Sequence, residues 1–318
     1  MQLLTAYLTK AALRSTPFEA DQPLYPTLFP FMEGSPGGIY KLKVTPYLAG
    51  GDARESVPPP ELMAQWSPDN VRDEALHLLA QGPLEVAITG DVDEQAAVAA
   101  VAATLGTLPP RPDYNAPTEG ANIRAFPEPE PDPIVFTHNG LPDQAMGIVN
   151  FPTIDVLGPR LETRQLSVLQ AVLRLRATDK IREELALAYS IAVTGFNSPD
   201  YEDYGYIRML AKVEPEKLPV FYDAVREIVE DLQTDLVDDD ELRRAREPML
   251  DDNIQARDRI HFWHRQNLAS FYRENTVEDA LTANEELMTV TPAMIQEMAR
   301  KYLRFDKAHK ISIVPENK

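Results

Sequence analysis

The feature of this sequence that most restricts its fold is an internal repeat. The tripeptide Glu-Leu-Met at residues 61–63 recurs at residues 286–288. A Ser-Pro pair that begins at Ser67 recurs as a Thr-Pro pair that begins at Thr291, an offset of 291 − 67 = 224 residues. In both copies an amphipathic segment and then a short apolar run follow. A repeat of this kind indicates a protein built from copies of one folded unit.

The second copy of the repeat is nearly whole, whereas the first contains only the C-terminal part of a unit. We therefore expect the chain to be a piece of a longer protein in which this unit is repeated. Residues 109–133 are rich in proline and poor in apolar side chains, which is typical of a linker. We predict a truncated unit at residues 1–111, a linker at 112–123 and a complete unit at 124–318. The truncated unit is expected to be the less stable one.

Apolar periodicity predicts the secondary structure of the chain. We predict strands at residues 39–44, 84–89, 134–137, 144–151, 189–194, 204–213 and 310–314. We predict helices at residues 1–14, 67–80, 94–105, 161–178, 216–234, 239–272, 276–288 and 292–303. Because strands and helices gather in groups instead of alternating strictly, this order favours a layered α+β domain over a doubly wound parallel sheet.

Composition excludes several functions. The net charge of −19 and the isoelectric point near 4.7 argue against nucleic-acid binding, because phosphates would be repelled. No apolar run is long enough to predict a membrane span. Cysteine is absent, which rules out disulfides, thiolate catalysis and zinc–sulfur sites within this chain and identifies no cellular compartment.

The histidines and the acidic clusters do not predict a metal site. Neither His-Glu-x-x-His nor His-x-x-Glu-His occurs. His261 and His264 are one helical turn apart, but no carboxylate stands at the standard offset, so a surface or interface pair is favoured over metal ligation. Asp91 and Asp93 precede a predicted helix and are interpreted as capping residues.

One pair of residues has the chemistry to bind a peptide. Arg182 and Tyr189 are seven residues apart, at the end of the long helix that begins near residue 161. If the helix extends that far, both side chains leave the same face, and a guanidinium and a phenol can donate to one carbonyl oxygen. The alternative is an Arg on a helix flank and a Tyr that fills a helix-to-strand corner. Spacing alone leaves both interpretations open.

Several motifs together resemble one enzyme family. They are Gly-Pro-Leu-Glu-Val-Ala-Ile-Thr-Gly-Asp-Val-Asp at residues 82–93, Asp-Gln-Ala at 143–145, Phe-Pro-Thr at 151–153, Ile-Arg-Glu-Glu at 181–184 with Tyr-Ser at 189–190, and Asp-Glu-Leu at 240–242 with Ala-Arg at 245–246. From about residue 55 onward the chain resembles the C-terminal half of the M16 zinc metallopeptidases, the pitrilysin and insulin-degrading-enzyme group, and most closely the bacterial PqqL-like members.

The resemblance implies a fold and a division of labour. Members of the family contain four similar α+β units in two halves that enclose a peptide, so this chain would hold a truncated third unit and a complete fourth. Each unit would be a two-layer structure, an antiparallel sheet with helices on one face. Zinc and the general-base Glu belong to the first unit, so zinc would be bound by a missing N-terminal half and not by this chain.

The resemblance also implies roles for two residues. Arg182 and Tyr189 would bind substrate carbonyls near the scissile bond, and the chain would contribute no catalytic residue or metal ligand of its own. Ala186 departs from the family pattern, because many relatives carry Gly there.

We therefore expect the chain to be the C-terminal half of a zinc-dependent endopeptidase. This half is expected to be inactive alone. Its partners would be the N-terminal half with the zinc motif and a peptide substrate. The alternatives are a non-catalytic structural or assembly subunit and an independent peptide-binding module. Periplasmic and cytoplasmic locations in a bacterium both remain open.

Overall fold

The computed structural model describes residues 1–111, 120–187 and 191–316. Contacts group the chain into two compact units, each made of three stretches. Unit 1 comprises Met1–Thr27, Pro58–Thr118 and Asn253–Thr282, and unit 2 comprises Leu28–Val57, Glu119–Asp252 and Ala283–Lys318. These units are contact clusters, whereas the predicted boundaries follow the order of the chain and stay a prediction.

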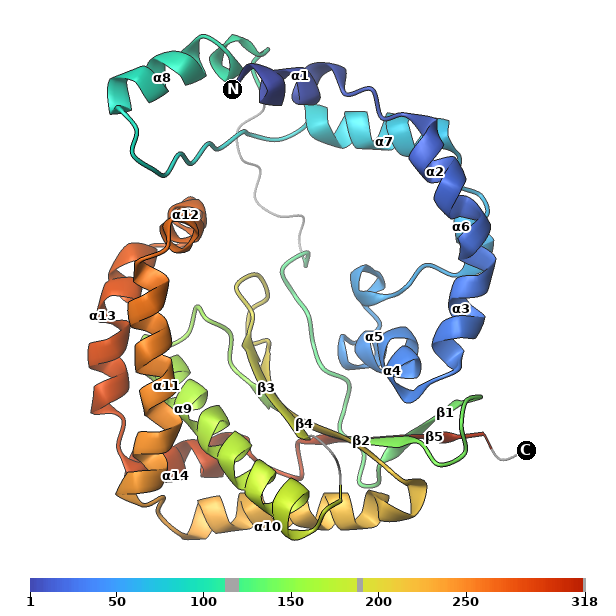
Figure 1. The fold of residues 1–318 in the computed structure, drawn as a ribbon, viewed down its shortest axis with the longest axis vertical. Coiled ribbons are helices and arrows are strands. Elements are labelled where there is room, and N and C mark those ends of the chain that lie inside the picture. Colours follow the sequence, from blue (N-terminus) through green and yellow to red (C-terminus); the bar gives the residue numbers. More distant parts are fainter. Residues whose placement is uncertain (112–119, 188–190, 317–318) are drawn as a thin grey trace. The chain divides into compact units, whose positions relative to one another are not determined.

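Unit 2 is built around one five-stranded sheet (Figure 1). The strands are β1 (Ile134–His138), β2 (Ala145–Thr153), β3 (Ile191–Asn197), β4 (Gly205–Val213) and β5 (His309–Pro315). Their order is β1-β5-β2-β4-β3, and every neighbouring pair is antiparallel except β1 with β5. The sheet and its helices confirm the predicted α+β class.

Three long helices cover one face of this sheet: α9 (Arg160–Ala177), α10 (Leu218–Thr234) and α14 (Pro292–Tyr302). The core between the layers contains Val149, Phe151, Leu169, Val172, Ile207, Met209, Phe221, Val225 and Ile295. Full burial of such side chains contributes about 1.5–3 kcal/mol each. Gly147 of β2 is required by this packing, because a Cβ atom there would lie 2.4 Å from Cδ1 of Phe221.

The opposite face of the sheet is partly covered by a short helical segment, for which a strand at residues 39–44 was predicted. That prediction is wrong. The segment consists of α4 (Pro36–Ile39), the π-helix η2 (Tyr40–Val44) and α5 (Thr45–Leu48). Its buried residues are Ile39, Val44 and Leu48, at spacings that fit a helix, and they pack on apolar side chains of β2 and β5. The strand prediction relied on Tyr40 and Leu42, which are only partly buried.

The long helix predicted at residues 239–272 is divided in two. It forms α11 (Asp239–Arg257) and α12 (Ile260–Ala269), and α13 (Thr276–Thr289) follows. The indole Nε1 of Trp263 donates to the carbonyl oxygen of Arg257 at 2.7 Å and so fixes the break between α11 and α12.

Unit 1 is helical in the part that the structure describes. Its helices include α1 (Gln2–Lys10), α2 (Ser15–Asp21), α6 (Pro60–Met63), α7 (Pro68–Ala80) and α8 (Glu94–Ala102). The strand predicted at residues 84–89 is absent, and this prediction is wrong. A strand needs a hydrogen-bonded neighbour, and residues 1–27, 58–111 and 253–282 contain no strand that provides one.

Unit 1 also has little buried core. Among its described residues, only Met63 and Leu105 belong to the buried hydrophobic set. Large apolar residues such as Leu3, Leu78 and Val98 are more than half exposed, at 68%, 60% and 62%. None of the helices within the described ranges is both long and apolar enough to cross a bilayer.

Candidate functional site

Arg182 lies on the surface of unit 2 at the end of the long helical segment. After α9 the chain continues as a π-helix, η5 (Thr178–Glu184), which fully buries Ile181 and exposes the residue that follows. The side chain of Arg182 is 52% exposed, and its Nη2 lies 3.1 Å from Oε1 of Glu183. Such an exposed pair binds weakly. The guanidinium is therefore available to a ligand.

Tyr189, the predicted partner of Arg182, lies outside the described residues. The helix ends at Glu184, so it does not extend as far as the sequence argument assumed. Ala186 then adopts a φ of +44°, and Leu187 is again buried. A left-handed conformation costs a non-glycine residue about 1–2 kcal/mol. This explains why glycine suits the position at which the sequence departs from the family pattern.

The pair His261 and His264 does not form a metal site in the described structure. His264 Nδ1 lies 3.3 Å from the hydroxyl oxygen of Thr89, to which the amide of Asn267 also donates at 3.1 Å. Within the described ranges, no group of three His, Cys, Asp or Glu side chains is placed to hold a metal ion. His264 therefore has a structural contact inside unit 1.

Two other histidines are buried in unit 2 and have structural roles. His138 Nδ1 accepts from the backbone N–H of Gly140 at 3.1 Å, and its Nε2 donates to the carbonyl of Gln144 at 2.7 Å. His309 Nε2 donates to the carbonyl of Pro127 at 2.8 Å. Burial lowers the pKa of His309, so the ring stays neutral at pH 7.

The acidic residues before the helices act as caps. The carboxylate of Asp93 accepts from the backbone N–H of Ala96 at 2.8 Å at the start of α8. Asp238 accepts from the N–H of Glu241 at 2.7 Å at the start of α11. Capping was the predicted role of Asp93, and the structure confirms it.

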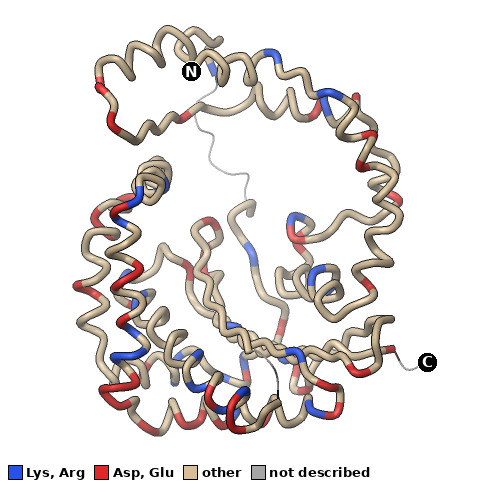
Figure 2. The backbone as a smooth tube through the Cα atoms, viewed as in Figure 1, with Lys and Arg blue, Asp and Glu red and all other residues tan. Residues whose placement is uncertain are grey.

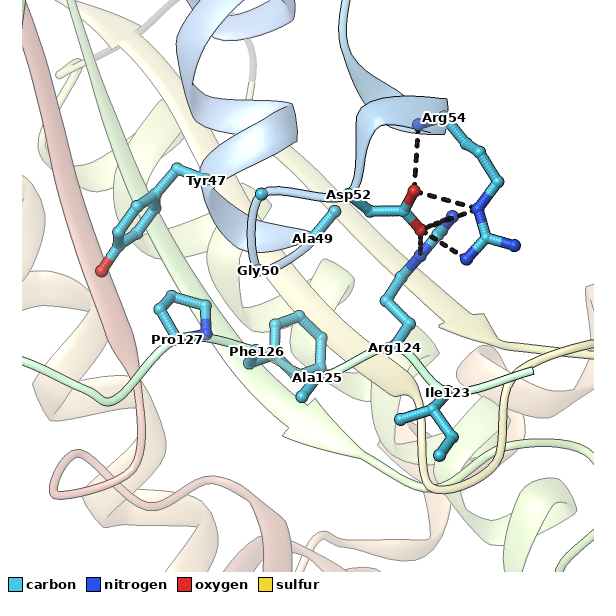
Figure 3. A pocket seen from close by; sticks show the side chains of 11 residues that line it. Tyr47, Ala49, Gly50, Asp52, Arg54, Ile123, Arg124, Ala125, Phe126 and Pro127 are labelled. Atoms are coloured by element: carbon cyan, nitrogen blue, oxygen red, sulfur yellow. Dashed lines mark hydrogen bonds and ion pairs between the residues drawn. The ribbon is translucent and has the colours of Figure 1, made fainter. Parts of the chain in front are cut away.

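A pocket of unit 2 with a volume of about 650 Å³ lies beside a cluster of charged residues that sequence reasoning did not identify (Figure 3). Arg54 and Arg124 both point at the carboxylate of Asp52 in this view. Arg54 donates to both oxygens of Asp52 at 2.8–3.1 Å, and Nη2 of Arg124 donates to Oδ2 at 3.1 Å. Nη1 of Arg124 also pairs with Glu55 at 2.8 Å, and its guanidinium lies 3.8 Å from the ring centre of Tyr201. We call these five residues the clamp cluster.

The clamp cluster is a structural tie. The Arg54 side chain lowers the pKa of Asp52 far below its ordinary value, although burial opposes the shift, and the Arg54 N–H and Arg124 lower it further. Every charge in the cluster has an opposite partner, and the cluster contains no nucleophile next to a base. Asp52 and Arg124 are 72 residues apart, so no motif could have predicted that they meet.

Comparisons with known proteins address the fold. Residues 66–249 match a family model described as the peptidase M16 inactive domain. The periplasmic protease PqqL from Escherichia coli is similar, with a TM-score of 0.73 and 12% identity over 95% of this chain and 33% of that one. A search of curated proteins finds no match.

Two further solved structures are similar over most of both chains. A protease from Helicobacter pylori gives a TM-score of 0.74 with 11% identity, covering 99% of this chain and 75% of the other. A peptidase M16 inactive domain from Pseudomonas fluorescens gives 0.72 with 16% identity, covering 99% and 74%. This chain spans about a third of PqqL. At these identities the structural likeness concerns the fold, and the family match covers more than half of the 318 residues. The chain therefore belongs to the M16 peptidase family, as a protein that contains its inactive domain.

Proposed function

We propose that this chain is the C-terminal half of a zinc-dependent endopeptidase and supplies the wall that holds the substrate peptide. The observation that carries the proposal is the match of residues 66–249 to the inactive domain of a peptidase family. The exposure of Arg182 supports it, since a residue that binds substrate must be reachable.

Arg182 and Tyr189 have the chemistry for this role. Zinc on an N-terminal half would supply the activated water that attacks the peptide carbonyl. The guanidinium of Arg182 and the phenol of Tyr189 would donate hydrogen bonds to carbonyl oxygens of the bound peptide, and these bonds would strengthen as negative charge develops. Removal of one such donor typically costs about 2.7–4 kcal/mol, or roughly 100- to 1,000-fold in rate.

The proposal is tested by adding the purified chain to an N-terminal half that carries His-x-x-Glu-His and zinc, and measuring cleavage of a quenched fluorescent peptide. We expect cleavage by the mixture only. Arg182→Ala and Tyr189→Phe should each lower kcat/KM by roughly 100-fold. Arg243→Ala is the matched control, because Arg243 is as exposed as Arg182, at 53% against 52%. Rates in both variants equal to that of the control would refute the role of the pair.

A non-catalytic subunit is the second candidate. It is favoured by the description of the matched domain as inactive. A stable complex of the two halves that binds zinc but cleaves no peptide would support this candidate over the first.

A further inference from the structure

Arg208 is a buried cation in the middle of the sheet. It lies on β4, on the face opposite α9 and α10, and only 8% of its surface is exposed. Its Nε donates to Oδ1 of Asn150 on β2 at 2.9 Å, and its Nη1 donates to the hydroxyl of Tyr40 on η2. The ring centre of Tyr206 lies 4.0 Å from its guanidinium carbon. These contacts fix the guanidinium in one position.

The positive charge of Arg208 has no counter-charge in the described structure. Asn150 and Tyr40 are neutral partners, and no carboxylate of the described residues forms an ion pair with Arg208. The strands themselves offer none, because β1–β5 contain no acidic residue (Figure 2). Arginine does not lose its proton in proteins. A buried charge without a partner is costly, so this arrangement calls for an anion.

Arg124 differs from Arg208 because carboxylates neutralise its charge. Arg124 is also buried, with 6% of its side chain exposed, but Asp52 and Glu55 neutralise it. Both arginines contact the same small cavity. Its one acidic lining residue, Glu55, is already paired with Arg124. Arg208 is therefore the cation of the cavity that remains unpaired.

The cavity beside Arg208 has room for a small group. Its volume is about 250 Å³, and its walls include Tyr40, Leu48, Phe196, Tyr204 and Tyr206. This is below the roughly 300–1,000 Å³ of clefts that hold a drug-sized molecule. Nη2 of Arg208 donates to no described residue, so a guanidinium N–H is left for a ligand. The aromatic walls suit the apolar atoms that accompany a charged group.

We propose that this cavity binds one carboxylate of a peptide, either the side chain of an acidic residue or the C-terminal carboxylate. A carboxylate matches the planar guanidinium and carries a single charge, whereas the net charge of −19 repels multiply charged anions more strongly. The inference rests on the proposed function only in taking the ligand to be a peptide. It gives that peptide an acidic anchor.

The test is calorimetric titration of the 318-residue chain at 0.15 M NaCl with three acetylated pentapeptides. They are Ala-Ala-Glu-Ala-Ala amide, Ala-Ala-Gln-Ala-Ala amide and Ala-Ala-Gln-Ala-Ala with a free carboxyl end. At this salt concentration charges beyond about 8 Å are screened, so the contact in the cavity dominates. At least one acidic peptide should bind about 10- to 100-fold more tightly than the neutral one, as hydrogen bonds to a charged group allow.

The two acidic peptides distinguish the sources of the carboxylate. Preference for the first assigns an acidic side chain, and preference for the third assigns the C-terminus. Equal binding of all three by the wild-type chain would overturn the proposal, and this comparison needs no variant.

Variants then assign the site. Arg208→Met, which keeps an unbranched side chain but removes the guanidinium, should abolish the preference, and Arg208→Lys should retain part of it. Arg243→Met removes the same charge from an exposed position and should change nothing. An unchanged preference in a folded Arg208→Met chain would also overturn the proposal. Because no cleavage is measured, acidic-peptide binding without peptidase activity would retain the site while removing the proposed function.

Discussion

Two arginines of unit 2, Arg124 and Arg208, place their guanidinium groups in different surroundings. Arg124 is neutralised by two carboxylates and ties the turn at residues 52–55 to the segment that follows residue 120. Arg208 is also buried but has only neutral partners. An arginine whose guanidinium N–H groups are paired with carboxylates stabilises the fold. An arginine with a free guanidinium N–H beside a cavity can bind a ligand.

The clamp cluster makes the stability of unit 2 depend on pH. Because the pKa of Asp52 in the folded chain is lowered from the ordinary value of 3.8, its contribution is fully present above that value and is lost as the pH falls below it. Asp52→Asn should cost about 1–2 kcal/mol at pH 7, and this difference should shrink below about pH 4. Hydrogen exchange of the backbone amides of β4 and β5 measures this loss of stability in unit 2.

The control for Asp52 is Asp306→Asn. Asp306 forms an exposed pair with Arg304, at 62% and 45% exposure, so its replacement should leave exchange unchanged. A difference for Asp52→Asn that persisted undiminished at low pH would contradict the assignment of its stability to the ionised carboxylate.

The two helices α7 and α14, predicted to be copies in a repeat, start alike but pack differently. In α7 the side chain of Ser67 accepts from the N–H of Asn70, and in α14 that of Thr291 accepts from the N–H of Met294. Both helices have Pro at the first turn. Yet α14 buries Ile295 in the core of unit 2, whereas α7 has no buried residue. The same cap begins both helices, and only α14 packs into a core.

Because α7 and α14 share the same kind of cap, removal of the cap should destabilise both helices by a similar amount. Ser67→Ala and Thr291→Ala should each destabilise their helix by about 1 kcal/mol. Because α7 belongs to unit 1 and α14 to unit 2, hydrogen exchange should accelerate in one unit for each variant. Ser67→Thr and Thr291→Ser are the controls, since each keeps the capping oxygen. Loss of protection in both units from either alanine variant would show that the units unfold as one.

The sequence predicted elements well where local chemistry decides them. Pro68 after a capping serine and Asp93 before an alanine-rich helix place helix starts to within a residue. The segment at residues 84–89 has the composition of a strand but no neighbour to pair with among the described residues, so composition alone misled. Arg208 contacts Asn150 because of the register of β2 and β4, and Asp52 contacts Arg124 because the fold brings distant segments together. Apolar periodicity predicts neither contact.

The whole molecule combines a unit with a dense core and a unit with almost none. Both tryptophans of the sequence, Trp66 and Trp263, belong to unit 1, whereas the two apolar clusters around the sheet belong to unit 2. Tryptophan fluorescence therefore reports on unit 1, and the amides of the sheet report on unit 2.

This placement predicts two separate unfolding transitions in urea. The fluorescence of Trp66 and Trp263 should change at a lower urea concentration than the circular dichroism of the whole chain, because unit 1 buries little apolar surface. Trp66→Phe and Trp263→Phe identify which indole carries the signal. Coincident midpoints by both probes would instead indicate one cooperative structure.

The order of the strands also bears on how the chain folds during synthesis. β1 and β2 are neighbours in sequence but never pair, because β5 lies between them. The ribosome must add residues 154–308 after β2 before β5 begins, which takes roughly 8–30 s at typical elongation rates of about 5–20 residues per second. Throughout that interval the position between β1 and β2 has no strand to fill it. A direct hairpin between β1 and β2 would be a kinetic trap, and the nascent chain has to avoid it.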